Sequence, residues 1–260
     1  MSVLENFLTS GIFAFMIIFV RFGTAMMIMP GIGDSFVPGN IRLYIALGLS
    51  LVMAPVIQPF IPNPVPAFGP MISLLVIEFI TGLFIGTIAR VLMMAMDTGG
   101  MLISLASGVS NAQVFNPSLA VQGSVFGAFL SITGVTLLFV TNLHHLLIHG
   151  LVESYHMFPV GGVPDTGGMA ELMAKAVAAS FLTGFQISMP FVVISIVLYV
   201  GMGVLTRLMP QLQVFMIAIP IQILLALVTL AIVLSSVMLF FVSQFENGMV
   251  FFLSQGGGGK

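Results

Sequence analysis

The chain has 260 residues, of which 59% are hydrophobic and 14 carry a formal charge, six Lys or Arg and eight Asp or Glu. This charged fraction of 5% is far below the roughly 25% of ordinary soluble domains, so a water-soluble globular fold is excluded. A net charge of -2 with so few bases argues against nucleic-acid binding, and the lack of cysteine excludes disulfides, thiolate metal sites and thiol catalysis.

Six apolar segments, separated by turn-forming and charged residues, are each long enough to cross a bilayer as a helix. They are residues 7–29, 41–61, 71–96, 124–150, 172–200 and 214–245. The sequence therefore predicts an all-α, polytopic helical membrane protein with about six long hydrophobic helices. We expect one membrane domain over residues 1–245 and a flexible C-terminal tail over residues 246–260.

The connections between these segments differ in character. Residues 30–39 are dense in turn-forming residues, and residues 161–168 predict a flexible glycine-rich loop. Six of the fourteen prolines fall between Pro55 and Pro70, which predicts an extended, stiff link.

The connection from Asp97 to Gly123 is unusual because it mixes glycine, serine and amide residues and is neither clearly apolar nor clearly polar. Lipid cannot satisfy the backbone groups of such a loop, so at membrane depth it would be enclosed by protein or line a water-filled cavity. An ordinary surface loop is the other interpretation that the composition allows.

Three charged residues, Arg21, Glu78 and Arg90, lie within apolar stretches. A charge there costs a few kcal/mol or more, so each is expected to face protein or water and to have a partner. We expect Arg21 to pair with Glu78, because Glu78 and Arg90 would lie about 120° and about 18 Å apart on one helix. The pair is interpreted as a tether between helices, with a role in proton or ion transport as the alternative.

Two pairs of glycines have the GxxxG spacing, Gly82 with Gly86 and Gly123 with Gly127. Small residues at this spacing let helix backbones approach closely in a membrane. Both segments are therefore expected to pack against other helices.

Neither a metal site nor a catalytic site emerges from the residue pattern. His145 and His149 have the i, i+4 spacing of zinc-binding helices, but Leu146 stands where metalloproteases carry their glutamate, and the nearest acid is Glu153. No serine can be assigned a base and an orienting acid. We expect a non-enzymatic protein without metal or cofactor, with an intramembrane hydrolase as an alternative.

The segment from Leu205 to Phe215 reads as a tight turn between two apolar helices. A helix-end cation, a helix-breaking proline and two side-chain amides occupy it; these are Arg207, Pro210, Gln211 and Gln213. This segment resembles the signature of the flagellar biosynthetic protein FliR family and of its injectisome counterparts. Segments 37–42, 78–86 and 142–161 resemble the same family in the same order, so the similarity covers roughly residues 10–245.

The resemblance implies a subunit of the flagellar type III protein export gate, forming part of the channel for unfolded flagellar export substrates. Its implied partners are FliP-like and FliQ-like gate subunits, an FlhB-like subunit, the unfolded substrate proteins and membrane lipid. The implied location is the bacterial inner membrane, with several membrane passes, at the flagellar basal body. In the helical, hetero-oligomeric gate, residues 1–150 would be a FliP-like part and residues 170–245 a FliQ-like part.

In that family the middle loop acts as a plug in the closed pore, and by order along the chain this loop is residues 104–122. The residues expected to fill the pore or to gate it are Gly108, Ser110, Asn111, Gln113, Phe115, Asn116 and Pro117. An injectisome gate subunit and a transporter or channel for small solutes are the alternatives that the sequence leaves open.

Overall fold

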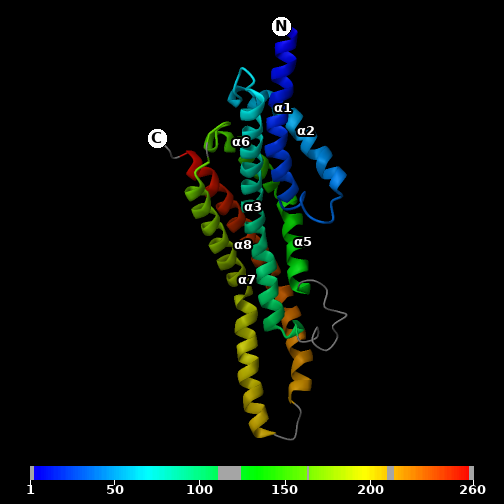
Figure 1. Cartoon of the computed structure of the whole chain (residues 1–260). Helices are drawn as coiled ribbons and strands as arrows, with labels where there is room; N and C mark the ends of the chain where they lie inside the picture. The colour runs from blue at the N-terminus through cyan, green and yellow to red at the C-terminus, as the bar shows by residue number, and fades with distance from the viewer. Residues whose placement is uncertain (1–2, 111–123, 163, 210–213, 258–260) are drawn as a thin grey trace. The chain divides into compact units, whose positions relative to one another are not determined.

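The structure is a computed structural model that describes residues 3–110, 124–162, 164–209 and 214–257. These residues are helical nearly throughout, and no strand occurs among them (Figure 1). The helices are α1 (Val3–Ile28), α2 (Gly39–Ile57), the short 3-10 helix η1 (Gln58–Phe60), α3 (Phe68–Ala106), α5 (Val125–Val140), α6 (Leu143–Met157), α7 (Thr166–Leu208) and α8 (Val214–Gly257). The predicted all-α class is confirmed.

Within this described part of the chain, five helices are long and apolar enough to cross a membrane: α1, α2, α3, α7 and α8. The pair α5 and α6 makes a sixth if it counts as one bent span. The predicted polytopic membrane protein is therefore confirmed by the length and composition of its helices.

The fourth predicted span, residues 124–150, is not one continuous helix, because it is interrupted between Val140 and Leu143. Asn142 there has a φ of 61°, a left-handed conformation that asparagine tolerates better than most residues. Its carbonyl accepts a hydrogen bond of 3.0 Å from the backbone N–H of His145, which starts the next helix.

The chain divides into two compact units. Unit 1 takes residues from 1–92, 139–177 and 246–260, and unit 2 takes residues from 93–138 and 178–245. Neither unit is one continuous stretch, so they differ from the predicted division into parts 1–150 and 170–245. The likeness of those two parts to FliP and FliQ stays a prediction.

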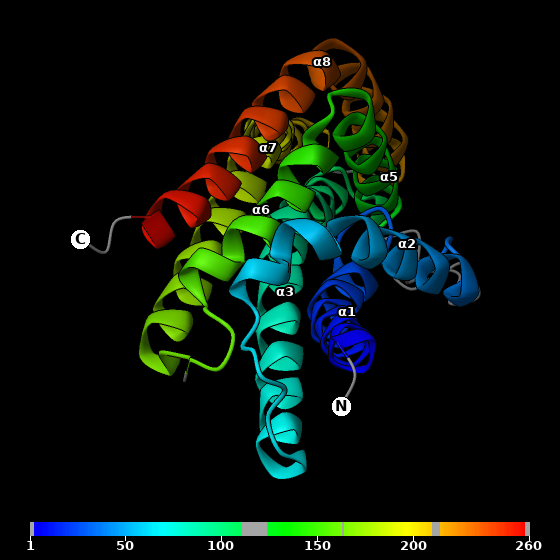
Figure 2. The ribbon, with the colours of Figure 1, turned by 90° about the horizontal axis from the view of Figure 1, so that it is seen from above.

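In unit 1, α1 packs side by side with the first half of α3 (Figures 1 and 2). A Cβ atom added at Gly82 would lie 2.4 Å from the carbonyl oxygen of Arg21, and one at Gly86 would lie 2.8 Å from that of Ala25. Because both contacts advance by four residues in the same direction, α1 and this part of α3 run parallel. The first GxxxG pair is thus the place where the two backbones meet.

In unit 2, a second set of glycines brings backbones together. A Cβ atom at Gly100 on α3 would lie 2.3 Å from the Cα atom of Gly127 on α5. One at Gly184 on α7 would lie 2.8 Å from the carbonyl oxygen of Ala95. The second half of α3 therefore has close neighbours on two sides.

These contacts correct the prediction that a connection begins at Asp97. Helix α3 continues to Ala106, so the first ten residues of the predicted connection are helical. Their glycines, which indicated a loop in the sequence, are the points at which α5 and α7 touch α3. The predicted plug segment, residues 104–122, accordingly begins inside a helix.

The C-terminal region and the proline-rich connection also differ from the prediction. Helix α8 continues to Gly257, so the tail predicted from residue 246 is helical over most of its length. The proline-rich connection is not uniformly extended, because Pro55 lies inside α2 and η1 follows directly after that helix.

The glycine contact between α1 and α3 generates a prediction. Substituting Gly82→Ala forces the two backbones apart and should destabilise the protein by about 1–3 kcal/mol, as overpacking does. Gly48→Ala on α2 is the matched control, because a Cβ atom there meets open space. The midpoint of thermal unfolding in detergent should fall for the first variant and stay or rise for the second. Equal midpoints would contradict the assignment of this contact.

Candidate functional site

The predicted plug segment lies only partly within the described residues. Ser104 is on α3, Gly108 follows that helix with a φ of 72°, and Ser110 lies two residues further on. The remaining predicted plug residues, Asn111, Gln113, Phe115, Asn116 and Pro117, lie outside the described part of the chain.

The two stems of this segment, the end of α3 and the start of α5, lie within the described residues and meet in unit 2. The hydroxyl groups of Ser104 and Ser124, 20 positions apart in the sequence, form a hydrogen bond of 2.5 Å. Ser124 Oγ lies 2.9 Å from the carbonyl oxygen of Gly100, to which it can donate. It also accepts a hydrogen bond of 3.0 Å from the backbone N–H of Gly127, which caps the start of α5. The chain therefore leaves and re-enters the helical framework at one place.

The last turn of α3 is held by α7 as well. Ser195 Oγ lies 2.6 Å from the carbonyl oxygen of Ala106 and 2.8 Å from that of Phe191, and its single proton serves one of them at a time. Carbonyl groups at a helix end lack partners within the helix, so a side-chain hydroxyl stabilises this end. Ser195 thus positions the end of α3, which lies within the predicted plug segment.

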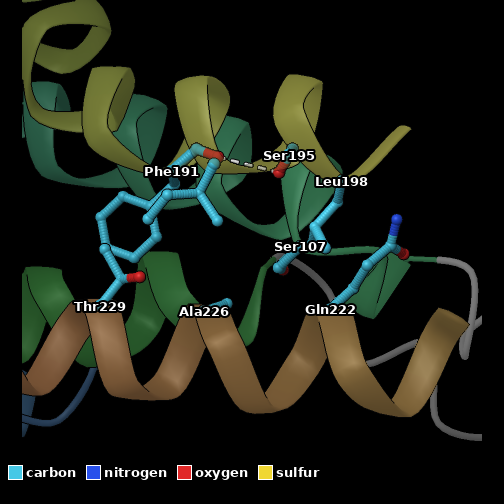
Figure 3. Close-up of a pocket in the computed structure, with 8 residues that line it drawn as sticks. Ser107, Phe191, Ser195, Leu198, Gln222, Ala226 and Thr229 are labelled. Carbon is cyan, nitrogen blue, oxygen red and sulfur yellow. Dashed lines mark hydrogen bonds between the residues drawn. The ribbon is translucent and has the colours of Figure 1, made fainter. Parts of the chain in front are cut away.

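A small cavity lies beside this contact, between α3, α7 and α8 within unit 2 (Figure 3). It is lined by Ser107, Phe191, Ile194, Ser195, Leu198, Gln222, Ala226 and Thr229. Its volume of about 10 Å³ is enough for one water molecule, and four of its lining side chains are polar. The cavity beside the end of α3 is therefore lined by apolar side chains together with a few hydroxyl and amide groups.

A second polar cluster lies in unit 1 around Arg21, whose side chain is 0% exposed, like that of Glu78. Arg21 donates to Glu78 through Nε at 2.5 Å and through Nη2 at 2.9 Å, which makes a two-point contact. Glu78 lies ten positions after the start of α3, about 15 Å along the helix and within its apolar length. The structure thus brings together the two residues expected to pair.

Helix α6 completes this cluster. Arg21 donates to Ser154 Oγ at 3.1 Å and to the carbonyl oxygen of Phe158 at 2.8 Å. The ring of Tyr155 lies over the guanidinium at 3.8 Å, close enough for a cation–π contact. One cation therefore connects α1, α3 and α6.

The third predicted intramembrane charge, Arg90, does not join this cluster. Its Nη1 donates to the carboxylate of Asp34, in the connection between α1 and α2. The sequence analysis named no partner for Arg90. The only sequence feature that could have indicated Asp34 as the partner is that it is an acid in the turn-rich connection.

The signature turn is described at its first end only. Arg207 is exposed in the last turn of α7, where a cation suits the helix dipole. Helix α7 ends at Leu208 and α8 begins at Val214. Pro210, Gln211 and Gln213 lie in the interval that the structure does not describe.

The histidines of α6 do not gather a metal-ligand set with the acids of the described residues, where no group of three or more suitable side chains occurs. His149 lies 3.8 Å from Glu153 one turn along the helix, and both are exposed.

Three polar residues of the two clusters were not singled out from the sequence: Ser154, Tyr155 and Ser195. Their available signal was a polar side chain in an apolar helix, which is too frequent here to single them out.

Comparison with known proteins assigns the sequence to a family. The sequence matches the family described as bacterial export proteins, family 1, over residues 12–248. A flagellar biosynthetic protein FliR from Caulobacter vibrioides is 36% identical over 89% of this chain and 92% of its own. Another FliR, from Aquifex aeolicus, is 28% identical over 88% of each chain. The Yop proteins translocation protein T of Yersinia pestis is 28% identical over 78% of each chain.

The Arg21 cluster generates a second prediction. Glu78→Gln leaves a buried guanidinium without its counter-charge and should destabilise the protein by about 3–5 kcal/mol. The double variant Arg21→Met with Glu78→Leu removes both charges and should recover most of that loss, because an apolar pair often replaces a buried ion pair without cost. Thermal unfolding of the purified proteins measures both effects. A double variant no more stable than the single one would contradict the tethering role.

Proposed function

The chain belongs to the family of bacterial export proteins, family 1, and from this we infer that it is a membrane subunit of a flagellar type III export apparatus. The nearly complete coverage of flagellar relatives supports this inference. We propose further that the subunit forms part of the export gate, the channel for unfolded flagellar substrates. In this role it is non-enzymatic and takes no cofactor.

The proposed plug is the segment between the two stems, and its role is to close the channel when no substrate is present. The single observation that supports it is the joining of the stems through Ser104 and Ser124 and through Gly100 and Gly127. In this proposal the helices on either side keep their positions when the segment is pushed aside. An export substrate could then displace it at little energetic cost.

The small side chains assigned to the plug suit a stopper that does not bind its substrate strongly. Gly108, Ser110 and Asn111 offer little apolar surface, and Gln113 and Asn116 offer amides that can exchange hydrogen bonds with water. Phe115 and Pro117 supply bulk. The energy for export would come from elsewhere in the apparatus, since the sequence has no phosphate-binding loop.

The Arg21 cluster has a different role in this proposal. It holds three helices of unit 1 together without an exposed charged group at its centre. This arrangement supports a tether rather than a path for protons or ions.

The signature turn is proposed to contact neighbouring subunits through Arg207, Pro210, Gln211 and Gln213.

The flagellar role is favoured over the injectisome role because the flagellar relative from Caulobacter vibrioides is 36% identical and the Yersinia pestis translocation protein 28%. The proposed neighbours are FliP-like, FliQ-like and FlhB-like subunits in the bacterial inner membrane, at the flagellar basal body. The remaining alternative, a transporter of small solutes, would work without them.

Purification tests this alternative. When the tagged chain is isolated in mild detergent, we expect it to carry other small membrane proteins in a complex of defined mass, measured by mass spectrometry of the intact assembly. A lone or self-associated chain that transports a solute would overturn the proposal.

Deletion tests the plug. Removing residues 108–116 should increase the leakage of small ions through the assembled gate, measured as ion flux in cells or vesicles. The same variant expressed without its partner subunits is the control, because leakage through the gate requires assembly. Unchanged leakage in a stably assembled variant would contradict the plug role.

A further inference from the structure

The connection between α1 and α2 gathers two arginines around one acid. Arg90, from α3, donates to the Asp34 carboxylate, which also accepts a hydrogen bond of 2.7 Å from the backbone N–H of Gly31. Arg42, in the first turn of α2, donates through Nη2 to the carbonyl oxygen of Asp34 and through Nε to that of Val37 at 2.9 Å. Both guanidinium groups are therefore fixed against the same short segment.

The charges of this cluster do not balance. Asp34 supplies one negative charge, whereas Arg42 and Arg90 supply two positive charges. Among the described residues Arg42 contacts carbonyl oxygens and no carboxylate, and the side chain of Arg90 is 41% exposed. A salt bridge that served only to hold the fold would account for Arg90 but not for Arg42. One positive charge thus remains for an external anion.

The cluster lies between two helices that are long and apolar enough to cross a membrane. The apolar length of α1 ends at Ile28 and α2 begins at Gly39, so Asp34 lies between two spans. Arg90 lies 22 positions after Phe68, the first residue of α3, or about 33 Å along the helix axis. That distance is close to the roughly 30 Å thickness of the hydrocarbon layer, so a hydrocarbon layer that begins at Phe68 would end near Arg90.

The side chains next to the arginines are apolar and exposed. Phe36 is 62% exposed in the connection, and Ile41 and Tyr44 are 46% and 67% exposed at the start of α2. Tyrosine at this level is typical of membrane interfaces, and isoleucine and phenylalanine suit contact with acyl chains. A free phosphate ion would gain nothing from these neighbours, whereas a lipid would.

We propose that Arg42 and Arg90, positioned by Asp34, bind the phosphate of an anionic phospholipid at the membrane surface. Guanidinium groups match phosphate oxygens in geometry and charge, and they keep their charge at any physiological pH. The bound lipid would neutralise the excess charge of the cluster and fix the depth at which α1, α2 and α3 sit. This inference stands independently of the proposed plug.

Lipid titration of the purified full chain in detergent tests the proposal, with native mass spectrometry counting the bound molecules. We expect phosphatidylglycerol to bind more tightly than phosphatidylcholine, and inorganic phosphate not to displace it. Arg42→Gln and Arg90→Gln should each weaken phosphatidylglycerol binding about fivefold, as expected for one basic residue at a membrane surface. Arg42→Gln is the sharper variant, because no described carboxylate loses its partner.

Lys175→Gln is the charge-matched control, because it removes a cation that pairs with Glu171 on α7. It should leave phosphatidylglycerol binding unchanged. Equal binding of the two lipids, or equal loss in the Lys175 and Arg42 variants, would overturn the proposal, and displacement by inorganic phosphate would indicate a site for the free ion instead. If Arg42→Gln fails to fold, added salt decides with the unaltered chain: binding that is insensitive to salt would overturn the proposal.

Discussion

A buried guanidinium in the middle of an apolar helix is the constraint on which unit 1 depends. On insertion scales an arginine at the bilayer centre costs about 3 kcal/mol, so α1 is stable there only with partners from other parts of the chain. Glu78 of α3 supplies the counter-charge, and Ser154, Tyr155 and the Phe158 carbonyl of α6 surround the rest of the group. The packing of three helices follows from satisfying one side chain.

In unit 2, small residues and serine hydroxyl groups bring the helices together. The helices approach closely at Gly100, Gly127 and Gly184, and two serine hydroxyl groups lie against carbonyl oxygens of the last two turns of α3. Close backbone contact leaves little room for relative movement of these helices. The end of α3 and the start of α5 are therefore held together within unit 2.

Much of the fold could be predicted from the sequence because lipid imposes simple rules. The length of the apolar segments identifies the spans, and the cost of a buried charge requires a partner for Arg21. The end of α3 could not be predicted in this way. Glycine and serine between Asp97 and Ala106 indicate a loop by composition, whereas in the structure they are contact points for helices distant in the sequence.

The Arg21 cluster could be predicted from the sequence only in part. Glu78 could be chosen for Arg21 by excluding a pair on one helix, but the sequence does not indicate that Ser154 and Tyr155 of α6 contact the same guanidinium group. The break before α6 could not be predicted either, because an asparagine with a positive φ looks like any other asparagine in the sequence.

The separation of Arg21 from Glu78 also has a consequence for biosynthesis. The two residues are 57 positions apart, so at about 5–20 residues per second the ribosome completes α1 several seconds before the glutamate emerges. During that interval the first helix carries a charge whose partner has not yet been made. α1 therefore reaches its final position only together with α3, although it is the first helix to be synthesised.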